Sequence, residues 1–132
     1  MTEAQLVARV VKYLRTRFRE AVVFKHNDRI TAGVPDISIT RRPRVTWLEA
    51  KMFRTAHPAE SEIKKHFTPL QFERMKQLNN LRHGYYVVGY HDAEQRPRFT
   101  VTNPEFAREF WNYLFEESST FDGDLEQLLR FV

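Results

Sequence analysis

The chain has 132 residues, 42% hydrophobic and 29% charged, which is enough for one domain with a single core. It contains no cysteine, which excludes disulfides, iron–sulfur ligation and thiol catalysis. Its net charge of +4 favours a polyanionic partner, although many proteins that bind no nucleic acid carry such a charge.

The predicted elements begin with an amphipathic helix over 3–19, where Leu6, Val10, Leu14 and Phe18 recur every four residues. A short strand at 21–25 and a loop at 26–33 follow. Residues 36–40 and 45–51 then predict a β-hairpin, with the basic sequence RRPR as its turn. We expect a long loop over 52–67, which has only weak periodicity.

The second half of the chain predicts a helix over 68–83, a buried strand at 85–90 and an edge strand at 97–102. Two C-terminal helices are expected over 103–117 and 123–131. We expect a core at 2–102 and a helical extension at 103–132. The fold class is α/β: a mixed sheet of four to five strands flanked by helices in the order αβββαβ, with helix 68–83 as a parallel crossover.

Three charged residues lie at one end of the predicted hairpin. Residues i and i+2 of a strand face the same way, so Glu49 and Lys51 share a face while Ala50 points to the other. Asp36 opens the paired strand and should lie beside them. Two carboxylates so close repel each other unless a cation holds them, and oxygen ligands suit Mg²⁺ or Mn²⁺.

Each of these short signals is weak when taken alone. Glu49 and Lys51 could form an exposed salt pair worth less than about 1 kcal/mol. The dipeptide Pro35-Asp36 is an ordinary turn signal. What favours a site is their conjunction: Gly33-x-Pro35-Asp36, strand, turn, strand, then Glu49-x-Lys51.

With these motifs, the sequence resembles the PD-(D/E)XK, or restriction-endonuclease-like, nucleases, and most of all their VRR-NUC branch, which is related to archaeal Holliday-junction resolvases. The matching residues are Glu3 in TEAQLVARVVKYLR, GVPD at 33–36, EAK at 49–51 and Gln71 in TPLQ. They match in order and span 2–89. The segment 52–67 and the tail 103–132 have no matching counterpart in these modules.

The resemblance implies a role for each matched residue. Asp36 and Glu49 would ligate the metal with the backbone carbonyl of Ala50, and Lys51 would assist the attacking water. Glu3 would complete the acidic cluster, and Gln71 would orient Lys51 or a substrate phosphate. Glu3 could instead simply favour the start of its helix, and Gln71 could belong only to a capping box after Thr68.

Several basic residues other than Lys51 are candidates for binding the nucleic-acid backbone: Arg41, Arg42, Arg54, Lys64 and Lys65. The five histidines have no spacing typical of metal ligands, and we expect them to be scattered on the surface.

The resemblance implies a Mg²⁺-dependent endodeoxyribonuclease, with Mn²⁺ able to replace Mg²⁺ and no small-molecule cofactor. The expected substrate is branched DNA, such as a Holliday junction or a flap, because no base-reading element is evident. Cutting both strands would require a homodimer. Alternatives are an inactive nucleic-acid-binding module of the same fold and an RNA-cleaving nuclease.

The predicted location is cytoplasmic, in a bacterium or a phage. No stretch approaches the roughly 20 apolar residues of a membrane span, and the N-terminus lacks the apolar region of a secretory signal.

Overall fold

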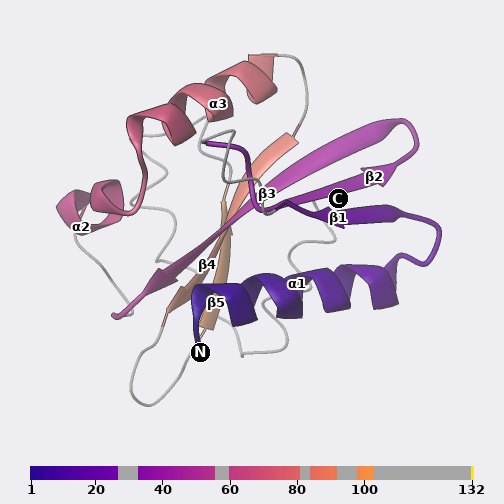
Figure 1. Ribbon diagram of the computed structural model, residues 1–132, viewed down its shortest axis with the longest axis horizontal. Helices are drawn as coiled ribbons and strands as arrows, with labels where there is room; N and C mark the ends of the chain where they lie inside the picture. The colour runs from indigo at the N-terminus through magenta and orange to yellow at the C-terminus, as the bar shows by residue number, and fades with distance from the viewer. Residues whose placement is uncertain (27–32, 56–59, 81–83, 92–97, 103–131) are drawn as a thin grey trace.

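The computed structural model describes residues 1–26, 33–55, 60–80, 84–91, 98–102 and 132. Five strands form one sheet in the order β1-β2-β3-β4-β5, and α1 and α3 lie on opposite sides of it (Figure 1). The elements are α1 (Glu3–Arg17), β1 (Val22–Lys25), β2 (Ile37–Arg41), β3 (Arg44–Phe53), α2 (Glu60–Lys65), α3 (Pro69–Asn80), β4 (Gly84–His91) and β5 (Arg98–Thr102).

Helix α1 begins with a capping box. The Thr2 hydroxyl accepts the backbone N–H of Gln5, and the Gln5 side chain accepts the backbone N–H of Thr2. The apolar stripe predicted from the sequence is buried against β1, β2 and β3. The helix ends at Arg17, two residues earlier than predicted.

The predicted hairpin is present, with Arg42 and Pro43 as its turn. Strand β2 pairs with β3 from Ile37 opposite Leu48 to Arg41 opposite Arg44. Strand β3 continues to Phe53, so its last five residues extend beyond the start of β2. This unequal length leaves an opening in the sheet beside Glu49 and Lys51.

The mixed sheet is completed as predicted, because α3 connects β3 to a parallel β4 with Glu49 opposite Val87. Strand β5 pairs antiparallel with β4, so β1 and β5 form the two edges of the sheet. The α/β class and the order αβββαβ are therefore confirmed, with five strands. The helices predicted at 103–117 and 123–131 lie outside the described residues.

The long loop predicted over 52–67 is wrong in part. Met52 and Phe53 continue β3, because Phe53 is buried in the α3-side core. Residues 60–65, with the sequence ESEIKK, form the short helix α2. Among the described residues, no helix is long and apolar enough to cross a membrane.

The sheet separates two cores. The larger one joins α1 to the side chains of β1–β5 that face it, including Leu48 and Ala50. The smaller one, on the α3 side, contains Phe53, Phe67, Met75, Tyr85 and Val87. Because alternate residues of a strand point to opposite faces, Glu49 and Lys51 lie on the α3 side between Trp47 and Phe53.

Candidate metal centre

The turn before β2 brings Asp36 to the sheet. Gly33 has a φ of +84°, which side-chain-bearing residues rarely adopt, and a Cβ there would lie 3.1 Å from atoms of Leu70 and Arg74 on α3. Pro35 is buried behind it. The GVPD sequence is therefore explained by a left-handed turn packed tightly against a helix.

Asp36 fills the place that β2 leaves empty beside β3. Its carboxylate accepts a hydrogen bond from the backbone N–H of Ala50 at 2.8 Å. Its own carbonyl accepts the backbone N–H of His26 at 2.7 Å, which continues the pairing between β1 and β2 by one residue. The side chain thus substitutes for a strand partner, so its position is fixed by the sheet.

Three carboxylates meet at this point. Oxygen atoms of Glu3, Asp36 and Glu49 all lie within 4.8 Å of one another. Glu49 is 2% exposed and comes from β3, whereas Glu3 comes from the first turn of α1 and is exposed. Residues distant in the sequence therefore form one acidic cluster, open to solvent on the Glu3 side.

Lys51 adds one cation to this cluster. Its Nζ lies 3.6 Å from Glu49 Oε1, and the side chain is only 7% exposed. The ammonium also lies 4.9 Å from the centre of the Phe67 ring. One cation among three carboxylates leaves the cluster with excess negative charge if all are ionised.

The electrostatics reflect that excess. Burial, followed by the nearby charge of Asp36, raises the pKa of Glu49 to about 8, although Lys51 opposes the shift. Burial also raises the pKa of Glu3 above its usual value, with Lys51 and His66 opposing. Burial and the neighbouring carboxylate thus both disfavour the charged form of Glu49.

Gln71 makes hydrogen bonds both within its helix cap and to the charged residues of β3. Its side chain and backbone form a capping box with Thr68, with bonds of 3.0 and 3.1 Å. The same amide accepts a hydrogen bond from Lys51 Nζ and donates one to Glu49 Oε1, both at 3.3 Å. The start of α3 therefore holds the two charged residues of β3 in place.

Tyr85 is a site residue that the sequence did not identify. Its hydroxyl donates to Glu49 Oε2 at 3.4 Å, and the side chain is fully buried. Burial and the charge of Glu49 raise the pKa of Tyr85, so the hydroxyl remains a donor. The YYVVGY strand gave no sign of this contact, because it depends on the register between β3 and β4.

A hollow of about 390 Å³ adjoins the acidic cluster. It is lined by Met1, Glu3, Met52, Phe53, Arg54, Glu62 and His66. Arg54, predicted to bind the nucleic-acid backbone, is exposed here, and Lys65 is exposed on α2 nearby in the chain. Lys64 belongs to α2, but its side chain lies outside the described part of the structure.

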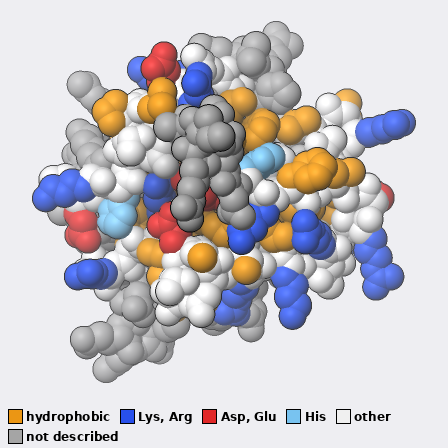
Figure 2. All heavy atoms as spheres, in the orientation of Figure 1, with side chains coloured by type: hydrophobic (Ala, Val, Ile, Leu, Met, Phe, Trp, Pro, Cys, Tyr) orange, Lys and Arg blue, Asp and Glu red, His pale blue; other side chains and the backbone are white. Residues whose placement is uncertain are grey.

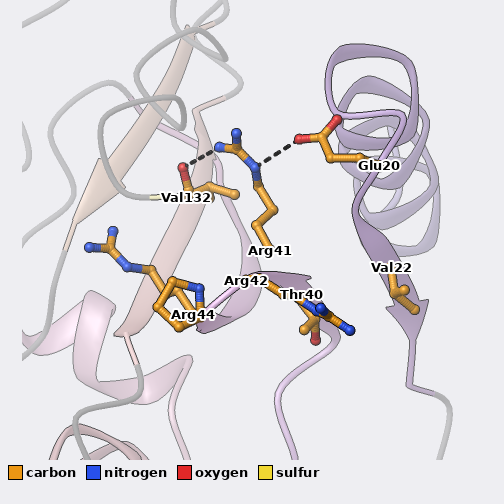
Figure 3. Close-up of a pocket in the computed structure, with 8 residues that line it drawn as sticks. Glu20, Val22, Thr40, Arg41, Arg42, Arg44 and Val132 are labelled. Carbon is orange, nitrogen blue, oxygen red and sulfur yellow. Dashed lines mark hydrogen bonds and ion pairs between the residues drawn. The ribbon is translucent and has the colours of Figure 1, made fainter.

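Arg41 and Arg42 are not near the cluster. They lie at the opposite end of β2 from Asp36, about 17 Å away by the usual rise of a strand. Arg41 donates to Glu20 and to the Val132 carbonyl (Figure 3). Its guanidinium lies 3.9 Å from the centre of the Phe18 ring. Any phosphate bound at this turn is therefore remote from the carboxylates.

The expectation that all histidines are scattered on the surface is wrong for His91. This side chain is fully buried, with Nδ1 3.1 Å from the Thr55 carbonyl and Nε2 2.9 Å from the Thr100 hydroxyl. It is buried because β4 is an interior strand with a core on each face. His26 is partly buried against Ser38, while His57 and His83 lie outside the described residues.

No protein-family model and no curated protein sequence matches the chain. Among solved structures, the chain is similar to Hjc, a Holliday junction resolvase of Archaeoglobus fulgidus. The match has 13% identity and a TM-score of 0.45, and it covers 70% of this chain and 74% of that one. A similarity at this identity and TM-score shows neither the family nor the activity of the chain.

Proposed function

We propose that this protein is a metal-dependent nuclease that hydrolyses phosphodiester bonds in DNA, as its resemblance to the VRR-NUC branch implies. The observation that supports this most directly is the cluster of Glu3, Asp36 and Glu49, whose carboxylate oxygens lie within 4.8 Å of one another beside the ammonium of Lys51.

The donor atoms of the cluster fit a hard divalent cation. All of them are carboxylate oxygens, and no histidine joins them among the described residues. The pKa of about 8 for Glu49 means that its negative charge is poorly compensated when only protein groups surround it. Asp36 and Glu49 would hold Mg²⁺ or Mn²⁺, with Glu3 at the solvent side.

The backbone of Ala50 supports its assignment as a third ligand. Its N–H points to Asp36, at the edge of β3 where β2 is absent. In a strand, the N–H and C=O of one residue point to the same edge, so the Ala50 carbonyl would face the cluster. Within the described part of the chain, no strand of the sheet occupies that edge beside Ala50.

A bound divalent ion would supply Lewis acidity to a phosphoryl oxygen and make a coordinated water more acidic. Lys51 would hold the attacking water or neutralise charge that develops on the phosphate. Its ammonium is already fixed by Glu49, Gln71 and Phe67. Little further ordering of Lys51 would be needed during the reaction.

The proposed substrate is branched DNA, and the proposed active form is a homodimer, since one cluster per chain cuts one strand. Arg54, Lys64 and Lys65 would hold the backbone beside the cluster. Arg41 and Arg42 would contact it at the far end of the hairpin.

A nicking assay tests this function. Labelled Holliday-junction, flap and linear DNA, with a matching RNA set, is incubated with the protein in Mg²⁺, Mn²⁺ or EDTA. We expect cleavage of branched DNA only with metal, and its loss in Asp36→Asn and Lys51→Ala. Cleavage in EDTA, or undiminished cleavage by both variants, would contradict the assignment. Binding without cleavage would indicate an inactive module, and a preference for RNA would change the substrate class.

A further inference from the structure

Strand β1 carries apolar side chains on a face that the core does not use. Val23 points toward α1 and is buried, but Val22 is 50% and Phe24 57% exposed on the opposite face. Among the described residues, Met1 is the only other large hydrophobic residue that is exposed to solvent.

Phe24 is one end of an aromatic row. The register places it opposite Ser38 of β2, and Ser38 opposite Trp47 of β3, so all three side chains face the same way. His26 lies between the two rings: its ring centroid is 6.4 Å from that of Phe24 and 5.3 Å from that of Trp47. We call Phe24, His26 and Trp47 the aromatic row.

The row adjoins the acidic cluster. The backbone N–H of His26 is bonded to the carbonyl of Asp36, and Trp47 lies two residues before Glu49 on the same face of β3. Two residues along a strand span about 7 Å. The row is therefore roughly one nucleotide away from the carboxylates, on the same side of the sheet.

Three basic side chains of these strands point to the other face of the sheet. Lys25 lines a hollow with residues of α1, and the Arg41 guanidinium pairs with Glu20 and lies 3.9 Å from the Phe18 ring at the end of α1. Arg44 lies opposite Arg41 in the strand register, so it faces the same way. The arginines line a hollow of about 730 Å³ at the hairpin turn, shown in Figure 3. Figure 2 shows hydrophobic side chains exposed in the region of β1 and β2.

We infer that the aromatic row stacks an unpaired nucleobase of the DNA strand whose phosphate lies at the acidic cluster. This inference rests on the proposed function and narrows it to substrates with unpaired bases, such as flaps and frayed branch points. Stacking of bases on aromatic rings is a usual means of holding single-stranded nucleic acid without reading its sequence. A fully paired duplex offers no base face to the row.

The alternative occupant is a second copy of the chain, paired through the exposed edge of β1. In such a symmetric contact the same surface meets itself. The row continues to the acidic cluster on the same side of the sheet, where the proposed function places a DNA phosphate, so a nucleotide of that strand is the occupant that fits better.

The experiment removes the aromatic ring of Phe24 from the protein and the bases from the DNA separately, and it compares the effects of the two changes on binding. Binding of a fluorescein-labelled oligothymidylate, and of the same backbone with abasic sites, is measured by anisotropy in EDTA for wild type and Phe24→Ala. Val22→Ala is the matched control, because it removes exposed apolar surface from the same face without removing a ring. Phe24→Trp restores a ring, and melting curves establish that all variants fold.

We expect Phe24→Ala to weaken oligothymidylate binding about 5- to 100-fold, the range for loss of one base stack. Binding to the abasic backbone should change less than about twofold, and Val22→Ala and Phe24→Trp should resemble wild type. Equal weakening on both ligands, an equal effect of Val22→Ala, or a change of oligomeric state in Phe24→Ala would overturn the inference. Because binding is measured without metal, failure of cleavage in Mg²⁺ would count against the proposed nuclease activity alone.

Discussion

Substitution of Glu49 by glutamine probes the electrostatic strain at the centre of the acidic cluster. The pKa of Glu49 is raised from 4.5 to about 8 in the folded, metal-free protein, mainly by burial and then by Asp36. A carboxyl group with a raised folded-state pKa stabilises the protein at a pH below its unfolded pKa. That stability is lost as the pH rises toward the folded-state pKa. The glutamine side chain cannot ionise, so the Glu49→Gln variant should lack this loss.

The magnitude follows from the two pKa values. Between about pH 5.5 and pH 8, a group with these values lowers the free energy of unfolding by about 3 kcal/mol. For a chain of this length that corresponds to a fall of roughly 10 °C in the melting temperature. In EDTA, the melting temperature of wild type should fall by this amount more than the melting temperature of Glu49→Gln does.

Urea unfolding followed by circular dichroism at both pH values measures the difference. Glu73→Gln is the matched control, because Glu73 is exposed on α3 and away from the cluster. Adding Mg²⁺ at the higher pH should restore stability to wild type but not to Glu49→Gln, since a ligand that binds only the folded state stabilises it. Identical pH dependence in wild type and Glu49→Gln would refute this reasoning.

Two further substitutions separate structural from site roles. Glu3→Gln should weaken Mn²⁺ binding about tenfold, measured by calorimetry, with little change in melting temperature because Thr2 and Gln5 still cap α1. An unchanged affinity would leave Glu3 only a helix-start role. Gln71→Ala and Thr68→Ala should each lose a capping bond worth about 1 kcal/mol. Only Gln71→Ala should also slow cleavage about 10- to 100-fold; equal rates in the two variants would reduce Gln71 to a cap.

Local patterns were sufficient to predict the framework. The period-four apolar stripe predicted α1, and alternation around the basic turn predicted the hairpin formed by β2 and β3. Asp36 and Glu49 could be placed together because a hairpin fixes the pairing of its two strands once the turn is known. Asp36, Glu49 and Lys51 therefore converge because of the hairpin register, and the position of the turn in the sequence specifies that register.

Contacts that depend on the parallel pairing could not be predicted in this way. Tyr85 reaches Glu49 because α3 returns the chain with Glu49 opposite Val87, and no local signal specifies that register. His91 is buried because β4 is covered on both faces, which depends on the whole sheet. The aromatic row could not be predicted for a different reason, because it requires the antiparallel register of β1 with β2 in addition to that of the hairpin.

The central claim is that Asp36 and Glu49 together hold a divalent cation, and anomalous diffraction from crystals grown with Mn²⁺ tests it most directly. The account predicts an anomalous peak bonded to carboxylate oxygens of both residues in wild type and its absence in Asp36→Asn. No peak at this cluster in wild-type crystals, with Mn²⁺ bound elsewhere or not at all, would contradict it.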